Sequence, residues 1–379
     1  MNKKEIAEIK KRLKKEGCTF TRMCGCYVDS THNRITRLGK TFLNLDEEEF
    51  YKYLELAKKV LSGTVGNNLL ELDFPLEEEE QGGKQQFLLG LRESKLKNEE
   101  LLERFYDLVI ENYCFTGNYL ILIYHDAYDV PLKTKDNRTL DESEEIYEYL
   151  LCAICPVTLS KPGLGYLEDS NEIGLRMRDW IVGAPDTGFV FPAFTDRSTD
   201  IHAALFYTKN AKEPPTEFIE GVLGCNQKMT ATEQKEVFRS ILEDALGEEN
   251  RYETIKEIHD KIHEKITENT ESSPKNVEPE QIELSKNTIR EILNNSGISE
   301  DKVIQAEQEY DKKVGEAKLY AENVVDQRKF EVKTYDVVLH VKPEKAARIK
   351  SQIIDGQKCL VIPMDANENV NVNGIHTTV

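Results

Sequence analysis

The hydrophobic positions of the first 225 residues alternate between a helical period and a strand-like period. Helical spacing predicts helices at 3–15, 46–63, 84–93 and 98–113. Strand-like spacing predicts strands at 19–28, 34–43, 118–124, 146–157, 176–182, 188–194 and 201–208. A helix over 144–151 is an alternative to the start of the 146–157 strand, and residues 130–143 read as a polar loop. We expect an antiparallel sheet with helices on one face.

Beyond Pro214-Pro215 the pattern becomes helical. Helices are expected at 216–223, 232–246, 252–268, 282–294 and 300–326, and a polar, proline-bearing linker at 269–281. The tail predicts a strand at 331–341, a helix at 343–354 and strands at 358–363 and 370–375. The chain is therefore expected to be an α+β protein with three parts: a sheet domain (1–225), a helical region (226–329) and a small β-α-β-β unit (330–379).

The charge and hydrophobicity of the chain limit which kinds of molecule it is expected to bind. The chain carries 50 Lys and Arg against 69 Asp and Glu, a net charge of −19, and an acidic chain is repelled by nucleic-acid phosphates and anionic membranes. No window approaches the roughly 20 apolar residues of a membrane span, and the charged residues 2–16 do not resemble a signal peptide. We expect a cytoplasmic protein whose partner is a protein or a small anionic ligand, and neither a membrane nor a nucleic acid.

Four phrases of the sequence carry a resemblance to a known family. They are Met23–Tyr27, Cys152–Pro156, Ser160–Leu164 and Phe191–Tyr207. Together they resemble a family of bacterial proteins catalogued as a domain of unknown function, mostly from anaerobic Gram-positive bacteria. The resemblance covers most of the chain and is densest in residues 1–225. It implies a bacterial cytoplasmic protein, and it implies no activity, cofactor or catalytic residue.

The densest candidate chemistry lies within Phe189–Asn210. Apolar runs flank six polar residues: Asp196, Arg197, Ser198, Thr199, Asp200 and His202. If a strand begins near Thr199, Asp200 and His202 share one face about 6.5–7 Å apart, where a carboxylate raises the pKa of an imidazole. Arg197 could then bind a carboxylate or phosphate. The alternative is a capped turn in which Arg197 pairs with Asp200.

Cysteine and histidine spacing offers further candidates. Cys24, Cys26, Cys152 and Cys155 could supply four thiolates to zinc if their strands are neighbours. However, a C-x-C on a strand encloses zinc poorly, and the C-x-x-C lies in an apolar run and does not clearly open a helix, as redox use requires. We therefore predict buried free thiols, and no metal or other cofactor.

The histidine motifs favour structural roles. His125 ends a predicted strand, a common position for a ligand-binding residue, but the adjacent Asp126 points to the opposite face. His259 and His263 lie one helical turn apart on a charged helix without an evident third ligand, which favours a solvated surface. The spacings of a phosphate-binding loop and of a nucleophile elbow are absent.

Two functional hypotheses follow. The first is a non-enzymatic binding or protein-interaction protein, since no catalytic motif is present and the charged helices are long. The second is an enzyme acting on a small anionic substrate at Arg197, Asp200 and His202, with His125 as a neighbour. An enzyme requires these side chains to converge in a concave pocket, whereas a binding protein exposes an apolar patch or groove.

Overall fold

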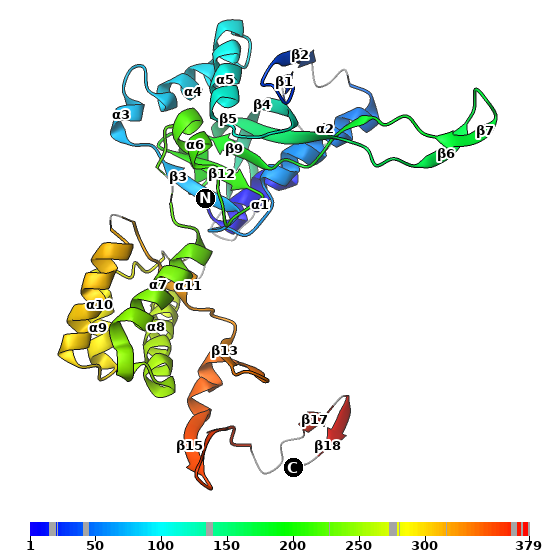
Figure 1. Cartoon of the computed structure of the whole chain (residues 1–379). Coiled ribbons are helices and arrows are strands. Elements are labelled where there is room, and N and C mark those ends of the chain that lie inside the picture. The colour runs from blue at the N-terminus through cyan, green and yellow to red at the C-terminus, as the bar shows by residue number, and fades with distance from the viewer. Residues whose placement is uncertain are drawn as a thin grey trace. The chain divides into compact units, whose positions relative to one another are not determined.

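The structure, a computed structural model, divides into two compact units, Met1–Thr230 and Ala231–Val379 (Figure 1). Each unit is considered by itself. The structure describes residues 1–14, 20, 22–40, 45–133, 139–226, 228–272, 279, 281–315, 317–364, 370–372 and 374–377, without the side chains of residues 40 and 132–144. The predicted division into three parts stays a prediction.

An eight-stranded sheet forms the centre of the first unit. Its strands are β1 (Arg22–Val28), β2 (Arg34–Lys40), β3 (Leu69–Asp73), β4 (Asn118–Lys133), β5 (Thr139–Leu159), β8 (Trp180–Val182), β9 (Thr187–Phe191) and β12 (Ala203–Thr208). The order is β2-β1-β4-β5-β9-β12-β3, with β8 also paired to β5, and every pair is antiparallel. The predicted α+β class is confirmed, and residues 146–157 form a strand and not a helix.

Helices cover both faces of this sheet, so the prediction of helices on one face is wrong. The first face packs against α1 (Lys3–Arg12) and α2 (Glu47–Val60) (Figure 1). The second face packs against α4 (Lys84–Glu93), α5 (Glu99–Asn112) and α6 (Thr216–Phe218). Helix α6 continues into a π-helical turn (Ile219–Leu223). Strand β4 explains the difference. Its residues Leu120, Leu122 and Tyr124 are buried on the first face, and Tyr119, Ile121 and Ile123 on the second. A strand with consecutive apolar residues needs cover on both sides.

Helix starts follow local capping signals in part. The Asn2 side chain accepts a hydrogen bond from the backbone of Glu5 (3.0 Å), and the Glu5 carboxylate accepts one from the backbone of Asn2 (2.7 Å), which closes a capping box at α1. Asn98 caps α5. Asp46 precedes α2 as predicted, but its side chain makes no capping hydrogen bond.

Three segments of the first unit differ from the sequence expectation. The predicted loop over 130–143 is shorter, because β4 continues to Lys133 and β5 begins at Thr139. The predicted strand over 188–194 is interrupted at Pro192, which has no N–H to donate to a ladder. Beyond it β10 (Ala193–Thr195) pairs with β11 (Ser198–Asp200) in a separate hairpin. The unpredicted β3 pairs with β12, and a short helix, α3 (Leu76–Glu79), follows β3.

A two-stranded ribbon, here called the arm (residues 160–179), projects from the sheet (Figure 1). It contains β6 (Leu164–Leu167) and β7 (Glu172–Leu175) and continues the pairing of β5 with β8 away from the sheet. Leu159 pairs with Trp180, and farther out Leu164 pairs with Leu175. The sequence predicted a strand over 176–182, of which only the last three residues are in β8.

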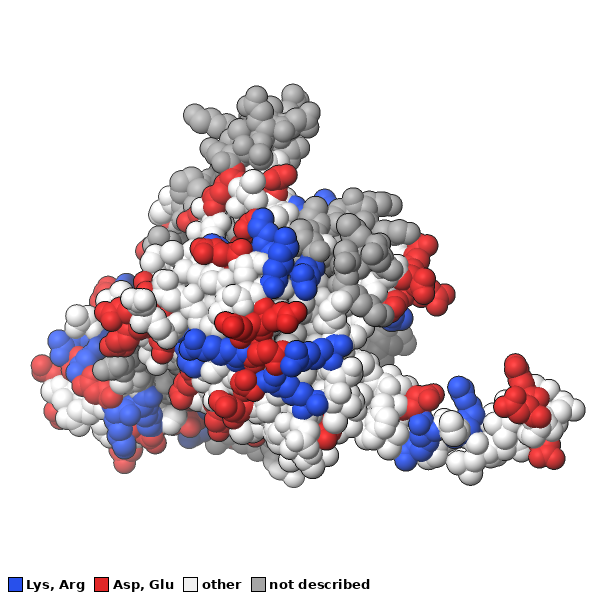
Figure 2. All heavy atoms as spheres, turned by 90° about the horizontal axis from the view of Figure 1, so that it is seen from above, with Lys and Arg blue, Asp and Glu red and all other residues white. Residues whose placement is uncertain are grey.

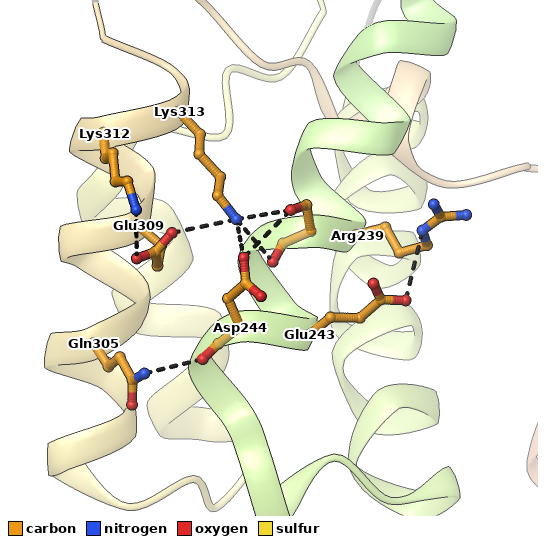
Figure 3. Close-up of polar contacts among 8 residues, drawn as sticks. Arg239, Glu243, Asp244, Gln305, Glu309, Lys312 and Lys313 are labelled. Carbon is orange, nitrogen blue, oxygen red and sulfur yellow. Dashed lines mark hydrogen bonds and ion pairs between the residues drawn. The ribbon is translucent and has the colours of Figure 1, made fainter.

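The second unit begins with a helical bundle. Its helices are α7 (Ala231–Leu246), α8 (Tyr252–Ser272), α9 (Lys286–Asn295), α10 (Glu300–Lys313) and α11 (Ala321–Val324), with a 3₁₀ turn (Gly247–Glu249) after α7. Between α7 and α10, the Lys313 ammonium reaches the Asp244 carboxylate and the Ser240 hydroxyl, while the Gln305 amide donates to the backbone oxygen of Asp244 at 2.9 Å (Figure 3).

Two helical predictions need correction. The helix expected over 300–326 ends at Lys313, because Gly315 has a left-handed φ of 57° that interrupts it, so residues 310–324 do not form one continuous seam. The linker predicted at 269–281 is helical over 269–272 as the end of α8. Residues 273–278 and 280 of that linker lie outside the described residues.

The C-terminal residues form hairpins, which corrects the predicted β-α-β-β unit. They are β13 (Phe330–Lys333) with β14 (Val338–Val341), β15 (Lys350–Ile354) with β16 (Gln357–Val361), and β17 (Val370–Val372) with β18 (Ile375–Thr377). Only a 3₁₀ turn (Pro343–Arg348) replaces the predicted helix over 343–354. The β-branched residues Ile353 and Ile354 favour a strand, and Asp355-Gly356 has the left-handed φ values of a tight hairpin turn.

Candidate functional site

The Asp196–His202 segment forms a tight turn followed by a short strand. Asp196 and Arg197 have φ values of 52° and 60°, and they connect β10 to β11. Strand β11 ends at Asp200, and β12 begins only at Ala203. Asp200 and His202 are therefore not on one continuous strand as expected. Instead, the Asp200 carboxylate accepts a hydrogen bond from the backbone N–H of His202 at 3.1 Å.

Arg197 binds the first helix. Its Nη2 donates to the Glu8 Oε1 at 3.0 Å and to the backbone oxygen of Pro131 at 2.9 Å. Burial is the largest single effect and disfavours the charged guanidinium, but the hydrogen bond to Glu8, the charge of Glu8 and the contacts with Tyr128 together outweigh it, so the pKa of Arg197 is raised. The expected pairing of Arg197 with Asp200 is replaced by this ion pair, which ties the turn to α1.

His202 has a different partner. Its Nδ1 lies 2.6 Å from Oε1 of Glu79, a residue of α3, and two-thirds of the side chain (67%) is exposed. The Glu79 carboxylate accepts a hydrogen bond from the protonated imidazole, which raises the pKa of His202. Arg197 and His202 therefore hold separate carboxylates, Glu8 and Glu79.

His125 lies on the other face of the sheet from Arg197. It continues the alternation of Ile121 and Ile123 on β4, toward α4 and α5, whereas Glu8 belongs to α1 on the opposite face. The side chain is buried, and desolvation lowers the pKa of His125. It is not a neighbour of the Arg197 turn as the sequence suggested.

The four candidate zinc cysteines are divided between the two faces. Cys24 of β1 and Cys152 of β5 are both directly opposite Ile123 of β4. Cys24, Cys26 and Cys152 therefore lie on one face of the sheet, but β4 separates Cys152 from the other two. Cys155 packs in the cluster of the other face, because a spacing of three residues on a strand reverses the side. Burial raises the pKa of all four thiols, that of Cys155 to about 12. Among the described residues, no group of three or more His, Cys, Asp or Glu could hold a metal ion.

We expect thiol titration of the denatured, unreduced protein to count all eight cysteines of the sequence. The seven described cysteines are free, and five of them, Cys24, Cys26, Cys152, Cys155 and Cys225, are buried. In the native protein those five should react slowly, since thiolates and not thiols are nucleophilic. The exposed Cys114 should react fast, and Cys114→Ser is the matched control that removes this fast phase. A denatured count below eight would contradict the prediction.

Of the two helical histidines, His259 packs against a neighbouring element of the second unit. The ring of His259 lies 6.3 Å from that of Phe330, and burial lowers the pKa of His259 to about 4. His259 is therefore a neutral imidazole that packs against Phe330 of β13. The solvated surface expected from the sequence is wrong for this residue.

A buried polar network under α1 is the arrangement that sequence reasoning missed. The Tyr149 hydroxyl donates to the Asp126 carboxylate at 2.7 Å, and Arg12 of α1 lies 3.8 Å from the same carboxylate. The Arg12 guanidinium also stacks over the Tyr128 ring at 3.8 Å, and the Tyr128 hydroxyl donates to Glu8 at 2.8 Å. The sequence did contain a signal for this network. Tyr124, Asp126 and Tyr128 alternate along β4, so the acid points to the same face of the sheet as the two buried tyrosines.

This network joins the Arg197 turn to the sheet through Glu8. Burial holds the pKa of Tyr149 well above its ordinary value, so the hydroxyl stays a proton donor. The side chains of Arg12 and Glu8 are less than one-fifth exposed. The arrangement fastens α1 and the β10–β11 turn to the sheet, and its polar groups are directed toward one another.

A groove on the first face lies apart from these residues. It has a volume of about 580 Å³ and lies between α2 and the segment after β8. Its lining is mostly apolar, with Tyr53, Leu56, Leu120, Val182 and Pro185, and charged side chains of α2 are at its rim. None of the candidate residues Arg197, Asp200, His202 or His125 lines it.

The arm carries a cluster of exposed large apolar side chains. Its large side chains are Leu164 (75% exposed), Tyr166 (58%), Ile173 (70%), Leu175 (71%) and Met177 (89%). Leu164 is directly opposite Leu175, and Tyr166 opposite Ile173, so these four share one face. The other face contains the paired Gly165 and Gly174, over which the Arg176 and Leu167 side chains fold. The arm therefore has a single apolar face that is open to solvent.

The comparisons with known proteins agree with the sequence resemblance. The family described as "Domain of unknown function (DUF4317)" matches residues 1–375. A search of curated proteins gave no match. Among the described residues, no helix combines the length and apolar character needed to cross a bilayer. The match spans almost the whole chain, so this protein belongs to the DUF4317 family.

Proposed function

We propose that this protein is a protein-interaction protein that docks a protein partner through the apolar face of the arm. The observation that carries the proposal is the pairing of Leu164 with Leu175 and of Tyr166 with Ile173 on one open face. A two-stranded ribbon is marginally stable in water by itself, and contiguous exposed apolar patches mark interaction sites. Burial of this face against a partner would stabilise the ribbon and remove its apolar side chains from water.

A protein partner fits the arm better than a lipid surface does. The outer end of the arm carries Glu168, Asp169 and Glu172, and the whole chain has a net charge of −19. Anionic lipid headgroups repel such an element at the point where it would first insert. We therefore propose that a protein, and not a lipid surface, covers the apolar face of the arm.

The alternative, an enzyme acting on a small anionic substrate, has less support. It requires Arg197, Asp200 and His202 to converge in a pocket. Arg197 binds Glu8, whereas His202 binds Glu79, and the groove beside α2 contains neither. An anion would have to displace a carboxylate from Arg197 before it could bind there.

Site-specific photo-crosslinking tests the proposal. A benzoylphenylalanine at position 166 of the full chain, expressed in its native cells, should give one protein adduct of reproducible mass on illumination. Ile173→Asp in the same chain should abolish the adduct, because a carboxylate on the paired position disrupts the apolar face. Tyr335 is fully exposed but lies in the β13–β14 turn, so the same probe there is the control. No adduct at 166, or equal adducts at 166 and 335, would refute the proposal.

A further inference from the structure

We infer that the partner of the arm is the arm of a second copy of this chain, joined through the apolar faces with the two arms antiparallel. This inference rests on the proposed function, and it names the partner. A two-fold contact uses the same surface on both copies, so the surface must be complementary to itself. The face formed by Leu164, Tyr166, Ile173 and Leu175 meets this condition, because an apolar block can pack against an identical block.

The charges along the arm specify the orientation of this pairing. The acidic end consists of Glu168, Asp169 and Glu172, and the basic end of Lys161, Arg176 and Arg178. The acidic end carries −3, and the basic end, with the neighbouring Asp179, carries 3 − 1 = +2. Figure 2 shows this separation on the projecting arm, with acidic side chains at its far end and basic ones nearer to the sheet.

The antiparallel arrangement is the one that these charges favour. It places the acidic end of each arm beside the basic end of the other, twice in one dimer. A parallel arrangement places acid against acid and base against base. None of the six side chains in the two ends forms an ion pair with another described residue of the first unit. Arg176 and Glu172 lie on the face of the arm that contains Gly165 and Gly174, and Nε of Arg178 donates to the backbone oxygen of Ser160 at 2.7 Å. These charges therefore act from beside the apolar face, where charges set orientation and specificity more than affinity.

The size of the contact indicates a weak dimer. A stable interface uses about 800 Å² and 20–30 residues from each partner, and the apolar face of the arm contains only four large side chains, with Met177 beside them. We therefore expect a monomer–dimer equilibrium with a Kd of roughly 1–100 μM.

Sedimentation velocity of the full chain tests the pairing with charge-reversed variants. The protein concentration is varied from well below to well above the expected Kd. The first variant reverses the acidic end (Glu168→Lys, Asp169→Lys, Glu172→Lys). The second reverses the basic end (Lys161→Glu, Arg176→Glu, Arg178→Glu). Each variant alone should dimerise at least about tenfold more weakly, because both contacts become repulsive. An equimolar mixture should recover the wild-type association, because each reversed end then meets its opposite.

Two controls make the outcome specific. Ile173→Asp should be monomeric both alone and in every mixture, since the apolar face is lost, and an unchanged melting temperature should show that each variant is folded. A wild type that stays monomeric throughout, single variants that still dimerise, or a mixture that fails to recover would each overturn the inference. An adduct at position 166 with a different protein would leave the proposed function standing while the self-pairing fails, whereas the absence of any adduct would remove both.

Discussion

Replacing Gly188 by alanine (Gly188→Ala) is expected to lower the melting temperature of the protein by about 6–12 °C. A Cβ at this position would lie 2.3 Å from the backbone oxygen of Cys152 and 3.0 Å from a methyl group of Val60. Overpacking of a core typically costs about 1–3 kcal/mol, and the upper end of about 3 kcal/mol applies here because the nearest atom belongs to the backbone. Each kcal/mol corresponds to about 2–4 °C for a domain of this size. Differential scanning calorimetry of the full chain measures the shift.

The position of Gly188 explains why the cost cannot be relieved. It lies in β9 between β5 and β12, opposite Ala153 on one side and Tyr207 on the other. A backbone shift away from Cys152 would break hydrogen bonds with the other neighbour, and Val60 of α2 closes the face.

Two other glycines provide matched controls. Gly39→Ala, on the edge strand β2, places a Cβ with no atom within 4 Å and should change the melting temperature by no more than about 1–2 °C. Gly25→Ala meets the backbone oxygen of Ile121 at 2.9 Å and two movable leucine side chains, so its effect should lie between the two. A melting temperature of Gly188→Ala equal to that of Gly39→Ala would contradict the strand packing described above.

Removing the buried carboxylate by Asp126→Ala is expected to cost about 2–4 kcal/mol of unfolding free energy, or about 5–15 °C in melting temperature. The change takes an acceptor from the buried Tyr149 hydroxyl and a negative charge from beside Arg12. Arg12 is 17% exposed, and this partial hydration keeps the cost below that of a fully buried pair.

Tyr149→Phe is the matched control for this network. It removes only the hydroxyl, while Asp126 still accepts the backbone N–H of Ala127 at 2.9 Å and remains near Arg12. We expect a loss of about 1 kcal/mol. If Asp126→Ala melts as Tyr149→Phe does, the charge contact between α1 and the sheet contributes nothing to stability.

The sequence predicted most helices and strands because their signals are local. Helix α4 was predicted with the bounds observed, and α5 and α7 to within one residue at each end, since each shows an apolar face with a helical period. The strand predicted at 118–124 was likewise found, as the first part of β4. Two of the errors occurred where one residue interrupts a periodic segment, as Gly315 does after α10 and Pro192 does after β9.

The candidate site was less predictable, because its contacts join residues that are distant in the chain. Arg197 binds Glu8, 189 residues away, and His202 binds Glu79, 123 residues away. A local pattern reports which residues are polar, but it does not report which element comes next to them. The expected pairings with Asp200 were therefore drawn from the nearest acid in the sequence.

The sequence by itself determined much of the secondary structure, the acidic character of the chain and the apolar character of its central strands, since composition and periodicity act over a few residues. Only the tertiary structure decided which face each side chain occupies and what covers it. Cys152 and Cys155 became separated by the sheet, Asp126 became the centre of a buried network, and Leu164 with Tyr166 remained open on the arm. The physical reason is that strand register and helix docking are set by contacts across the whole unit, and a single apolar residue is compatible with either a core or an interface.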